Sequence, residues 1–200
     1  GLRRAAGADS EGVGAFDAPR LTVRAEEYEE YKAQRPPMPS DLPQQLGLIK
    51  QLVDLLGVPR LELRGTEADD LLATLARRAV EAGRRVEIIT SDRDTLQLVS
   101  KHVTVRSPDA RGPVGPAEVL EKYGVRPDQW VDYRALTGDA SDNIPGVPGI
   151  GPVAARTLLE RYGTLDAVLD GLASIQPARY EKRLSENLDQ LHLSRRLSQL

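Results

Sequence analysis

Apolar residues recur with helical spacing in two long segments of the chain. The first segment starts near residue 40 and ends at Gly57, with apolar positions at Leu42, Leu46, Ile49, Val53 and Leu56. Residues three or four apart lie on one helical face, so this spacing predicts an amphipathic helix. A second helix is predicted at 66–82, with Thr66 as its N-cap and Gly83 just past its end.

Short apolar runs between the helices predict strands at 13–16, 60–63, 86–90 and 103–106. The run VEIIT at 86–90 is expected to be buried, and a short helix should follow it at 95–99. Strands that alternate with helices are typical of a parallel sheet with functional groups at the strands' carboxyl ends. We therefore expect an α/β core over 1–115, with a mostly parallel central sheet and flanking helices.

Beyond residue 115 only helical patterns occur, at 116–123, 127–137, 151–162, 164–169 and 177–200. They predict a helical module over 116–200, with a helix-hairpin-helix at about 144–170. The segment 18–39 is polar and ends in QRPPMPS, which favours a loop or arch with partial helix.

Composition excludes several classes of function. The 200 residues include no Cys, which excludes disulfides, thiolate metal sites and a Cys nucleophile, and favours a reducing compartment. We expect neither a signal peptide nor a membrane span, which needs about 18 apolar residues. The net charge of −3 does not by itself indicate nucleic-acid binding, and with 4% aromatic residues base stacking should contribute little.

Acidic residues stand at the ends of predicted elements in four groups: Asp17; Glu67, Asp69 and Asp70; Asp92 and Asp94; Asp139 and Asp142. Each group alone fits helix capping or a turn, because the helix dipole favours acids in a first turn. Four groups together exceed what capping requires. If they converge, each close pair of carboxylates costs about 4 kcal/mol at an effective dielectric near 20, and hard divalent cations remove that cost.

The predicted cofactor is Mg²⁺ or Mn²⁺, with two or more ions bound, because carboxylate oxygens suit these cations. The only two His, His102 and His192, have no metal-ligand spacing, which disfavours zinc. The chain also lacks the Gly-rich loop with Lys that holds a nucleotide. A two-metal carboxylate site usually breaks phosphate esters, and we predict that chemistry.

The sequence GVPGIG at 146–151 lies directly before a predicted helix. Gly149 and Gly151 are expected to take positive φ, and Pro152 suits a first helical turn. Free N–H groups at such a turn bind backbone phosphate without reading sequence. An ordinary tight turn is the alternative, but a helix ending at Gly163 and a second helix are typical of a helix-hairpin-helix.

Several motifs together carry a family resemblance: AFDA at 15–18, YKAQRPPMP at 31–39, GTEADDLLATLA at 65–76, IITSDRDTLQLV at 88–99 and TGDASDNIPGVPGIG at 137–151. In these motifs the chain resembles the 5′ nuclease domain of bacterial DNA polymerase I, which is related to flap endonucleases. The resemblance extends from residue 15 to about residue 197. The resemblance implies a resolvase-like (PIN) fold, a helical arch over the site and a hairpin module that binds duplex DNA.

The resemblance also implies residue roles. The eight acids named above would be metal ligands, and Lys32 and Arg35 would meet the scissile phosphate. Arg24 would be a further phosphate contact of the arch. DNA would be bound at the hairpin by Gly146, Val147, Gly149, Ile150 and Gly151. In this family, backbone carbonyls of the hairpin also bind K⁺.

One part of the family pattern has no counterpart. Family members begin with a strand that carries another metal-binding Asp, followed by a basic helix. Residues 1–14 offer only Asp9 and Glu11, in AGADSEG. We therefore expect a first strand and one metal-binding acid to be missing from this chain.

The sequence thus predicts a metal-dependent 5′-3′ exonuclease and 5′ flap endonuclease for replication and repair. Its partners would be flapped or nicked DNA and a following polymerase domain, without a membrane, and the chain would be a monomer in the bacterial cytoplasm, associated with the nucleoid. One alternative is a DNA-binding module that cuts poorly because the first strand and its Asp are missing. A metal-dependent phosphatase is a further alternative, against which the hairpin argues.

Overall fold

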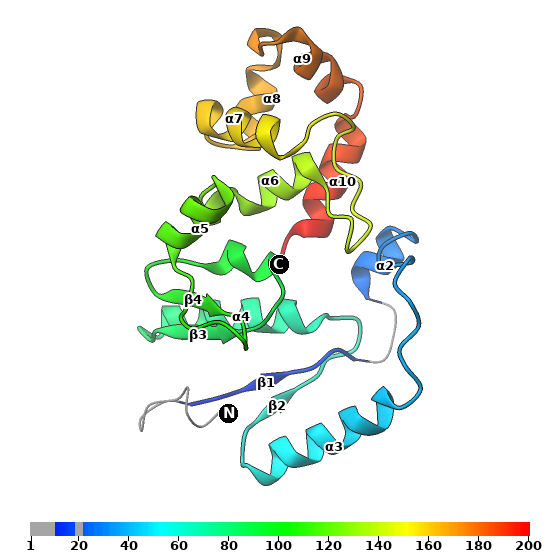
Figure 1. Cartoon of the computed structure of the whole chain (residues 1–200), viewed down its shortest axis with the longest axis vertical. Coiled ribbons are helices and arrows are strands. Elements are labelled where there is room, and N and C mark those ends of the chain that lie inside the picture. The colour runs from blue at the N-terminus through cyan, green and yellow to red at the C-terminus, as the bar shows by residue number, and fades with distance from the viewer. Residues whose placement is uncertain (1–10, 19–21) are drawn as a thin grey trace.

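The structure is a computed structural model that describes residues 11–18 and 22–200. The molecule is elongated, with helix α3 at one end, two short sheets beside helix α4 near the middle, and helices α7 to α9 at the other end (Figure 1). The expectation that a first strand is missing concerns residues 1–14, of which 1–10 lie outside the described residues. Residues 19–21 of the expected arch also lie outside them.

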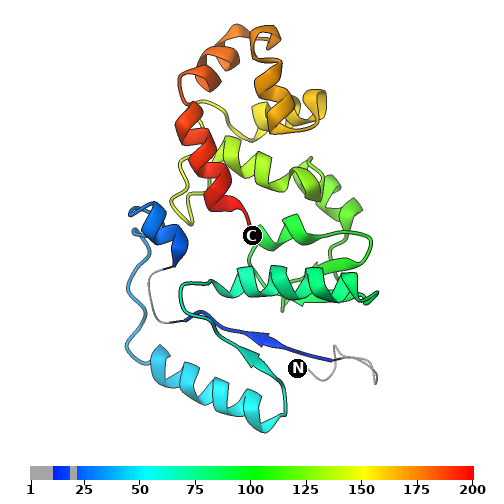
Figure 2. The same ribbon diagram turned by 180° about the vertical axis from the view of Figure 1, so that it is seen from behind.

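The strands pair in parallel, as predicted, but as two separate two-stranded sheets in the described part of the chain. β1 (Gly14–Ala15) pairs with β2 (Arg60–Leu61), and β3 (Val86–Ile89) pairs with β4 (Val103–Arg106). Helix α4 (Ala68–Glu81) contacts both β1 and β3 and so connects the two sheets (Figure 2). The expectation that 86–90 is buried was wrong in part: Ile88 is buried, whereas Ile89 is exposed.

The predicted helix at 66–82 forms as α4, but its N-cap is Glu67 rather than Thr66. The Glu67 backbone is extended, and its N–H donates to the side chain of Asp70 at 3.2 Å. The acid three residues on therefore sets the start of the helix, as in a capping box. This local bond places Glu67 and Asp70 side by side at one helix end.

Helix α3 (Leu42–Leu55) forms where the apolar spacing predicts it. The apolar face of α3 is nevertheless largely exposed. Val53 is the one apolar residue of this helix that is buried, and it lies against β1 and β2. A short helix α2 (Val23–Glu27) and turns through residue 35 make up the segment expected to form the arch. η1 (Asp94–Leu98) is a 3₁₀ turn in the place of the predicted short helix.

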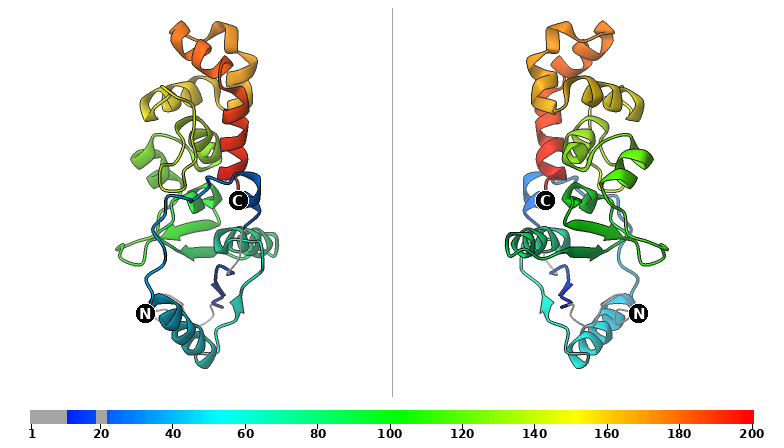
Figure 3. Two further views of the ribbon diagram at one scale, coloured as in Figure 1. Left: turned by 90° about the vertical axis from the view of Figure 1, so that its right-hand side faces the viewer. Right: turned by 90° about the vertical axis from the view of Figure 1, so that its left-hand side faces the viewer.

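The C-terminal half is helical, as predicted. It comprises α5 (Pro116–Tyr123), η2 (Pro127–Gln129), α6 (Trp130–Thr137), α7 (Pro152–Tyr162), α8 (Leu165–Asp170), η3 (Leu172–Ser174), α9 (Ala178–Ser185) and α10 (Leu188–Ser198). The helix predicted at 127–137 begins as a 3₁₀ turn, and the one at 177–200 is broken between α9 and α10. α10 packs along α6, and its end points back toward α4 (Figure 3). None of the helices described is long and apolar enough to span a bilayer.

Two glycines allow the backbone to cross itself after α6. A Cβ on Gly138 would lie 2.4 Å from the Ile144 carbonyl oxygen, and one on Gly146 would lie 2.2 Å from the Gly138 nitrogen. Both have positive φ, and Asp139 and Ile144 exchange backbone hydrogen bonds at 2.8 Å. The loop 139–145 is therefore closed at its base, directly before the hairpin.

Candidate metal and DNA site

The four predicted acidic groups meet where the sheets adjoin the helical half. Asp17 follows β1, three acids open α4, two follow β3, and two lie in the loop after α6. Asp17 Oδ1 accepts from the Ala68 backbone N–H at 2.7 Å, which connects the first group to the second. Asp92 Oδ1 accepts from the Asp94 N–H at 2.8 Å. The sequence thus predicted the convergence correctly, from the ends of separate elements.

The segment after α2 brings positive charge to these acids. Lys32 Nζ lies 2.9 Å from Glu67 and 3.6 Å from Asp142, while the Arg35 guanidinium pairs with Asp142. The Lys32 backbone has a φ of 58° and donates to the Asp142 carbonyl at 2.9 Å. The buried Tyr31 hydroxyl also contacts Glu67 at 3.1 Å and Asp142 at 3.3 Å. The turn is therefore held against α4 and the loop 139–145.

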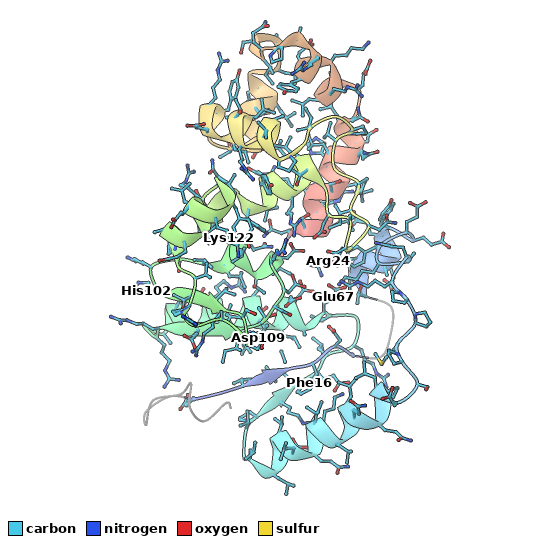
Figure 4. The ribbon with its side chains drawn as sticks, viewed as in Figure 1. Phe16, Arg24, Glu67, His102, Asp109 and Lys122 are labelled. Carbon is cyan, nitrogen blue, oxygen red and sulfur yellow. The ribbon has the colours of Figure 1, made fainter. Side chains whose placement is uncertain are left out.

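Arg24 lies inside the acidic cluster, where the resemblance implied a phosphate contact. Its guanidinium forms two bonds to Asp70, at 2.8 and 2.7 Å, and approaches Glu67 at 3.4 Å (Figure 4). It also donates to the carbonyls of Leu197 and Gln199. With its side chain only 11% exposed, Arg24 in this structure holds the end of α10 to the start of α4.

Arg134 is a site residue that the sequence reasoning missed. It bridges Asp94 and Asp139 from the last turn of α6. The available signal was its place in YRALTGD, five residues before Asp139 and in the last turn of α6. Nothing in the sequence indicates that Asp94, 40 residues earlier, joins them.

The positive charges do not balance the carboxylates. Eight acids meet four basic side chains among the described residues, namely Arg24, Lys32, Arg35 and Arg134. Burial, together with the charges of Asp92 and Asp17, raises the pKa of Asp69 to about 7. Burial also raises the pKa of Asp94 to about 6, although Arg134 opposes this shift. Both shifts are the signature of crowded, desolvated carboxylates.

This donor set fits divalent cations in chemistry and in charge. Its ligands are carboxylate oxygens, and the excess negative charge lies around Asp69 and Asp92. Among the described residues no three acids lie close enough to enclose one ion. Basic side chains separate Glu67 from Asp142 and Asp94 from Asp139. Which of the eight acids bind metal stays a prediction.

The hairpin differs from expectation at one glycine. Gly146 and Gly149 have positive φ, but Gly151 has a φ of −86° and serves as the N-cap of α7. Val147 and Ile150 are buried in the core and secure the turn from within. A Cβ on Gly149 would lie 3.2 Å from Arg183 Nε, so α9 brings to the hairpin a basic side chain that the sequence reasoning missed.

Comparison with protein families matches nearly the whole chain. Residues 4–124 match the N-terminal resolvase-like domain of 5′-3′ exonucleases, and residues 125–200 match their C-terminal SAM fold. The chain belongs to the 5′-3′ exonuclease family. The predicted resemblance and resolvase-like fold are thereby confirmed, whereas a domain boundary at 115/116 stays a prediction.

Curated members of this family are close in sequence. The thermostable DNA polymerase I of Thermus thermophilus is 52% identical over 185 residues, which are 92% of this chain and 22% of that protein. DNA polymerase I of Deinococcus radiodurans is 49% identical over 199 residues, 98% of this chain and 21% of that protein. The chain thus spans about a fifth of the length of these relatives.

Solved structures of phage T5 exonuclease share the fold. The T5 protein co-crystallised with metal ions has a TM-score of 0.83 at 24% identity, covering 98% of this chain and 77% of that one. A T5 flap endonuclease in complex with DNA and metal ions has a TM-score of 0.80, again at 24% identity, with coverages of 98% and 76%.

Proposed function

We propose that the chain is a metal-dependent 5′-3′ exonuclease and structure-specific 5′ flap endonuclease that hydrolyses DNA phosphodiesters in replication and repair. The observation that carries this proposal is the convergence of eight carboxylates from four segments beside Lys32 and Arg35. Family membership supports it, as do the metal ions and DNA in the T5 structures.

The proposed cofactor is a pair or more of Mg²⁺ or Mn²⁺ ions, held by the eight acids. Asp69 and Asp92 should be central ligands, because the charge of Asp92 raises the pKa of Asp69 and neither side chain forms an ion pair among the described residues. Bound ions would lower the pKa of a water to make the nucleophile and would stabilise the leaving oxygen.

Lys32 and Arg35 are proposed to stabilise negative charge on the phosphate. Their side chains are 24% and 50% exposed, so both remain accessible to a substrate. Each is now paired with a carboxylate, and a phosphate would replace Asp142 as the partner of Arg35. Tyr31 keeps the turn in place beneath them, because its ring is buried and its hydroxyl contacts acids on both sides.

The hairpin at 146–151 is proposed to hold duplex DNA through backbone phosphates, with K⁺ on its backbone carbonyls. Positive φ at Gly149 and the N-terminus of α7 place N–H groups at the turn, and Arg183 adds positive charge beside them. We further propose that the chain acts as a monomer on flapped or nicked DNA in the bacterial cytoplasm, at the nucleoid. In the parent protein a polymerase domain would follow it, as in the relatives.

Cleavage of an end-labelled 5′-flap duplex in Mg²⁺, against EDTA, tests the proposal. Asp92→Asn should lower the cleavage rate by orders of magnitude while duplex binding in Ca²⁺ persists, because the hairpin is untouched. Asp128→Asn is the matched control, because Asp128 is exposed and pairs with Arg126 rather than with the site, and it should cleave normally. A folded chain that binds the flap but never cuts it in Mg²⁺ or Mn²⁺ would refute the proposal, and so would full activity of Asp92→Asn.

A further inference from the structure

Arg134 contacts carboxylates from two segments that are distant in sequence. Its Nε donates to Asp94 Oδ1 at 3.1 Å, and its Nη2 lies 2.9 Å from Asp139 Oδ2. The three side chains are between 11% and 15% exposed. The guanidinium carbon also lies 5.3 Å from the centre of the Trp130 ring, which is buried in the core. One side chain therefore connects the segment after β3, the loop after α6 and the core.

The geometry uses the shape of the guanidinium as well as its charge. Two different nitrogens point at two different carboxylates, which a single ammonium group on a Lys cannot reproduce. Asp139 is held from the other side too, because its Oδ1 accepts from the Ser141 N–H at 2.9 Å and from the Ser141 hydroxyl at 2.7 Å. Both oxygens of Asp139 are thus engaged within the protein.

Among the described residues, Arg134 is also the only basic side chain that pairs with Asp94 or Asp139. The other basic side chains of the site, Arg24, Lys32 and Arg35, pair instead with Glu67, Asp70 and Asp142. Without Arg134, Asp94 and Asp139 would be two desolvated carboxylates with no positive partner. Such charges either take up protons or attract a cation from solution.

We propose that Arg134 is a positioning residue of the site: it fixes Asp94 and Asp139 relative to each other and supplies a resident positive charge that limits the attraction of divalent cations. This inference rests on the proposed function, since the ions it concerns are those of the nuclease. Both oxygens of Asp139 are already engaged by Arg134 and Ser141, so Asp139 would contact an ion through bound water rather than directly. Asp94 keeps one oxygen for an ion or its water.

The test compares Arg134→Met and Arg134→Lys with the unchanged chain, by thermal melting against Mg²⁺ concentration. Loss of one positive charge should tighten Mg²⁺ binding, so the half-saturating Mg²⁺ concentration of Arg134→Met should fall roughly three- to tenfold. Its cleavage rate should fall as well, because the two acids lose their fixed separation. Arg134→Lys should keep the Mg²⁺ dependence of the unchanged chain while losing part of the rate.

Tryptophan fluorescence gives a second readout that needs no cleavage. The chain has one Trp, so its emission reports the surroundings of Trp130 alone. Emission should shift in Arg134→Met, because the guanidinium no longer lies over the ring. Arg126→Met is the matched control, because Arg126 pairs with the exposed Asp128 and should leave Mg²⁺ dependence and emission unaltered.

An unchanged half-saturating Mg²⁺ concentration together with unchanged emission in Arg134→Met would overturn the inference, whatever happens to the rate. If Arg134→Met does not fold, Arg134→Lys decides: a Mg²⁺ dependence that shifts although the charge is kept would also overturn it. A failure of the proposed function is distinguishable, because the unchanged chain would then leave the flap uncut while its melting still responded to Mg²⁺.

Discussion

Asp132 offers the sharpest test of how the helical half is held together. Its side chain is 8% exposed, and its Oδ2 accepts from the backbone N–H of Leu165, the first residue of α8, at 2.8 Å. Its Oδ1 lies 3.1 Å from Arg195 Nε on α10. One carboxylate thus connects α6, α8 and α10. Asp132→Ala would leave a buried N–H at the fully buried Leu165 without a partner.

The expected loss of stability follows from those contacts. A buried donor left unpaired costs about 1–3 kcal/mol, and the lost charge partner of Arg195 adds about 1 kcal/mol more. A total near 3 kcal/mol lowers the melting temperature by about 6–12 °C in a chain of this length. Asp132→Asn should lose roughly a third as much, because its amide oxygen still accepts from Leu165.

The assay is thermal unfolding followed by circular dichroism in EDTA, so that metal binding does not contribute. Asp128→Ala is the control, because its pairing with Arg126 is exposed and such pairs contribute little. If Asp132→Ala melted within 2 °C of the unchanged chain (roughly 1 kcal/mol), or together with Asp132→Asn, the bond to Leu165 would not stabilise the fold as argued.

Three further predictions concern the glycines and the charge of the site. Gly138→Ala should destabilise the chain by at least about 3 kcal/mol in denaturant unfolding, because its Cβ meets the Ile144 carbonyl, whereas Gly83→Ala, with similar φ but open space, should cost about 1 kcal/mol. Gly149→Val should weaken duplex binding for all sequences in a fluorescence anisotropy titration, since its φ is 83°; equal affinity would make the turn merely structural. The fold raises the pKa of Asp69 to about 7. Protonation of Asp69 therefore stabilises the folded state by its full amount below about pH 4, and this contribution to the free energy of unfolding is lost as the pH rises through 7. Asp69→Asn should therefore flatten that part of the stability profile in EDTA, and an unchanged profile would contradict the shift.

Local signals were enough to predict much of the fold. The spacing of apolar residues located α3 and α4, and Gly163 marks the end of α7, because each depends on neighbours within a few residues. The convergence of the acids was also predictable, since the ends of parallel strands meet at one edge. The two separate sheets were not, because pairing depends on which strands lie adjacent in space.

The partners of the acids could not be predicted, because each comes from a distant segment. Arg134 meets an acid 40 residues earlier, and Tyr31 meets one 111 residues later. The hairpin illustrates a different limit. Val147 and Ile150 were predicted to bind DNA as part of the hairpin, yet both side chains are buried in the core. A motif identifies a turn, whereas the chemistry of each residue decides which way it faces.

The backbone crossing at Gly138 and Gly146 bears on where a strand would be cut. The crossing closes the loop that carries Asp139 and Asp142, and the hairpin begins at the second of its two glycines. The proposed duplex-binding turn and two of the proposed metal-binding acids therefore belong to one continuous, closed segment. In the proposed nuclease this segment would set the distance from the held duplex to the site of cleavage, so the length of the free 5′ end would not change that distance.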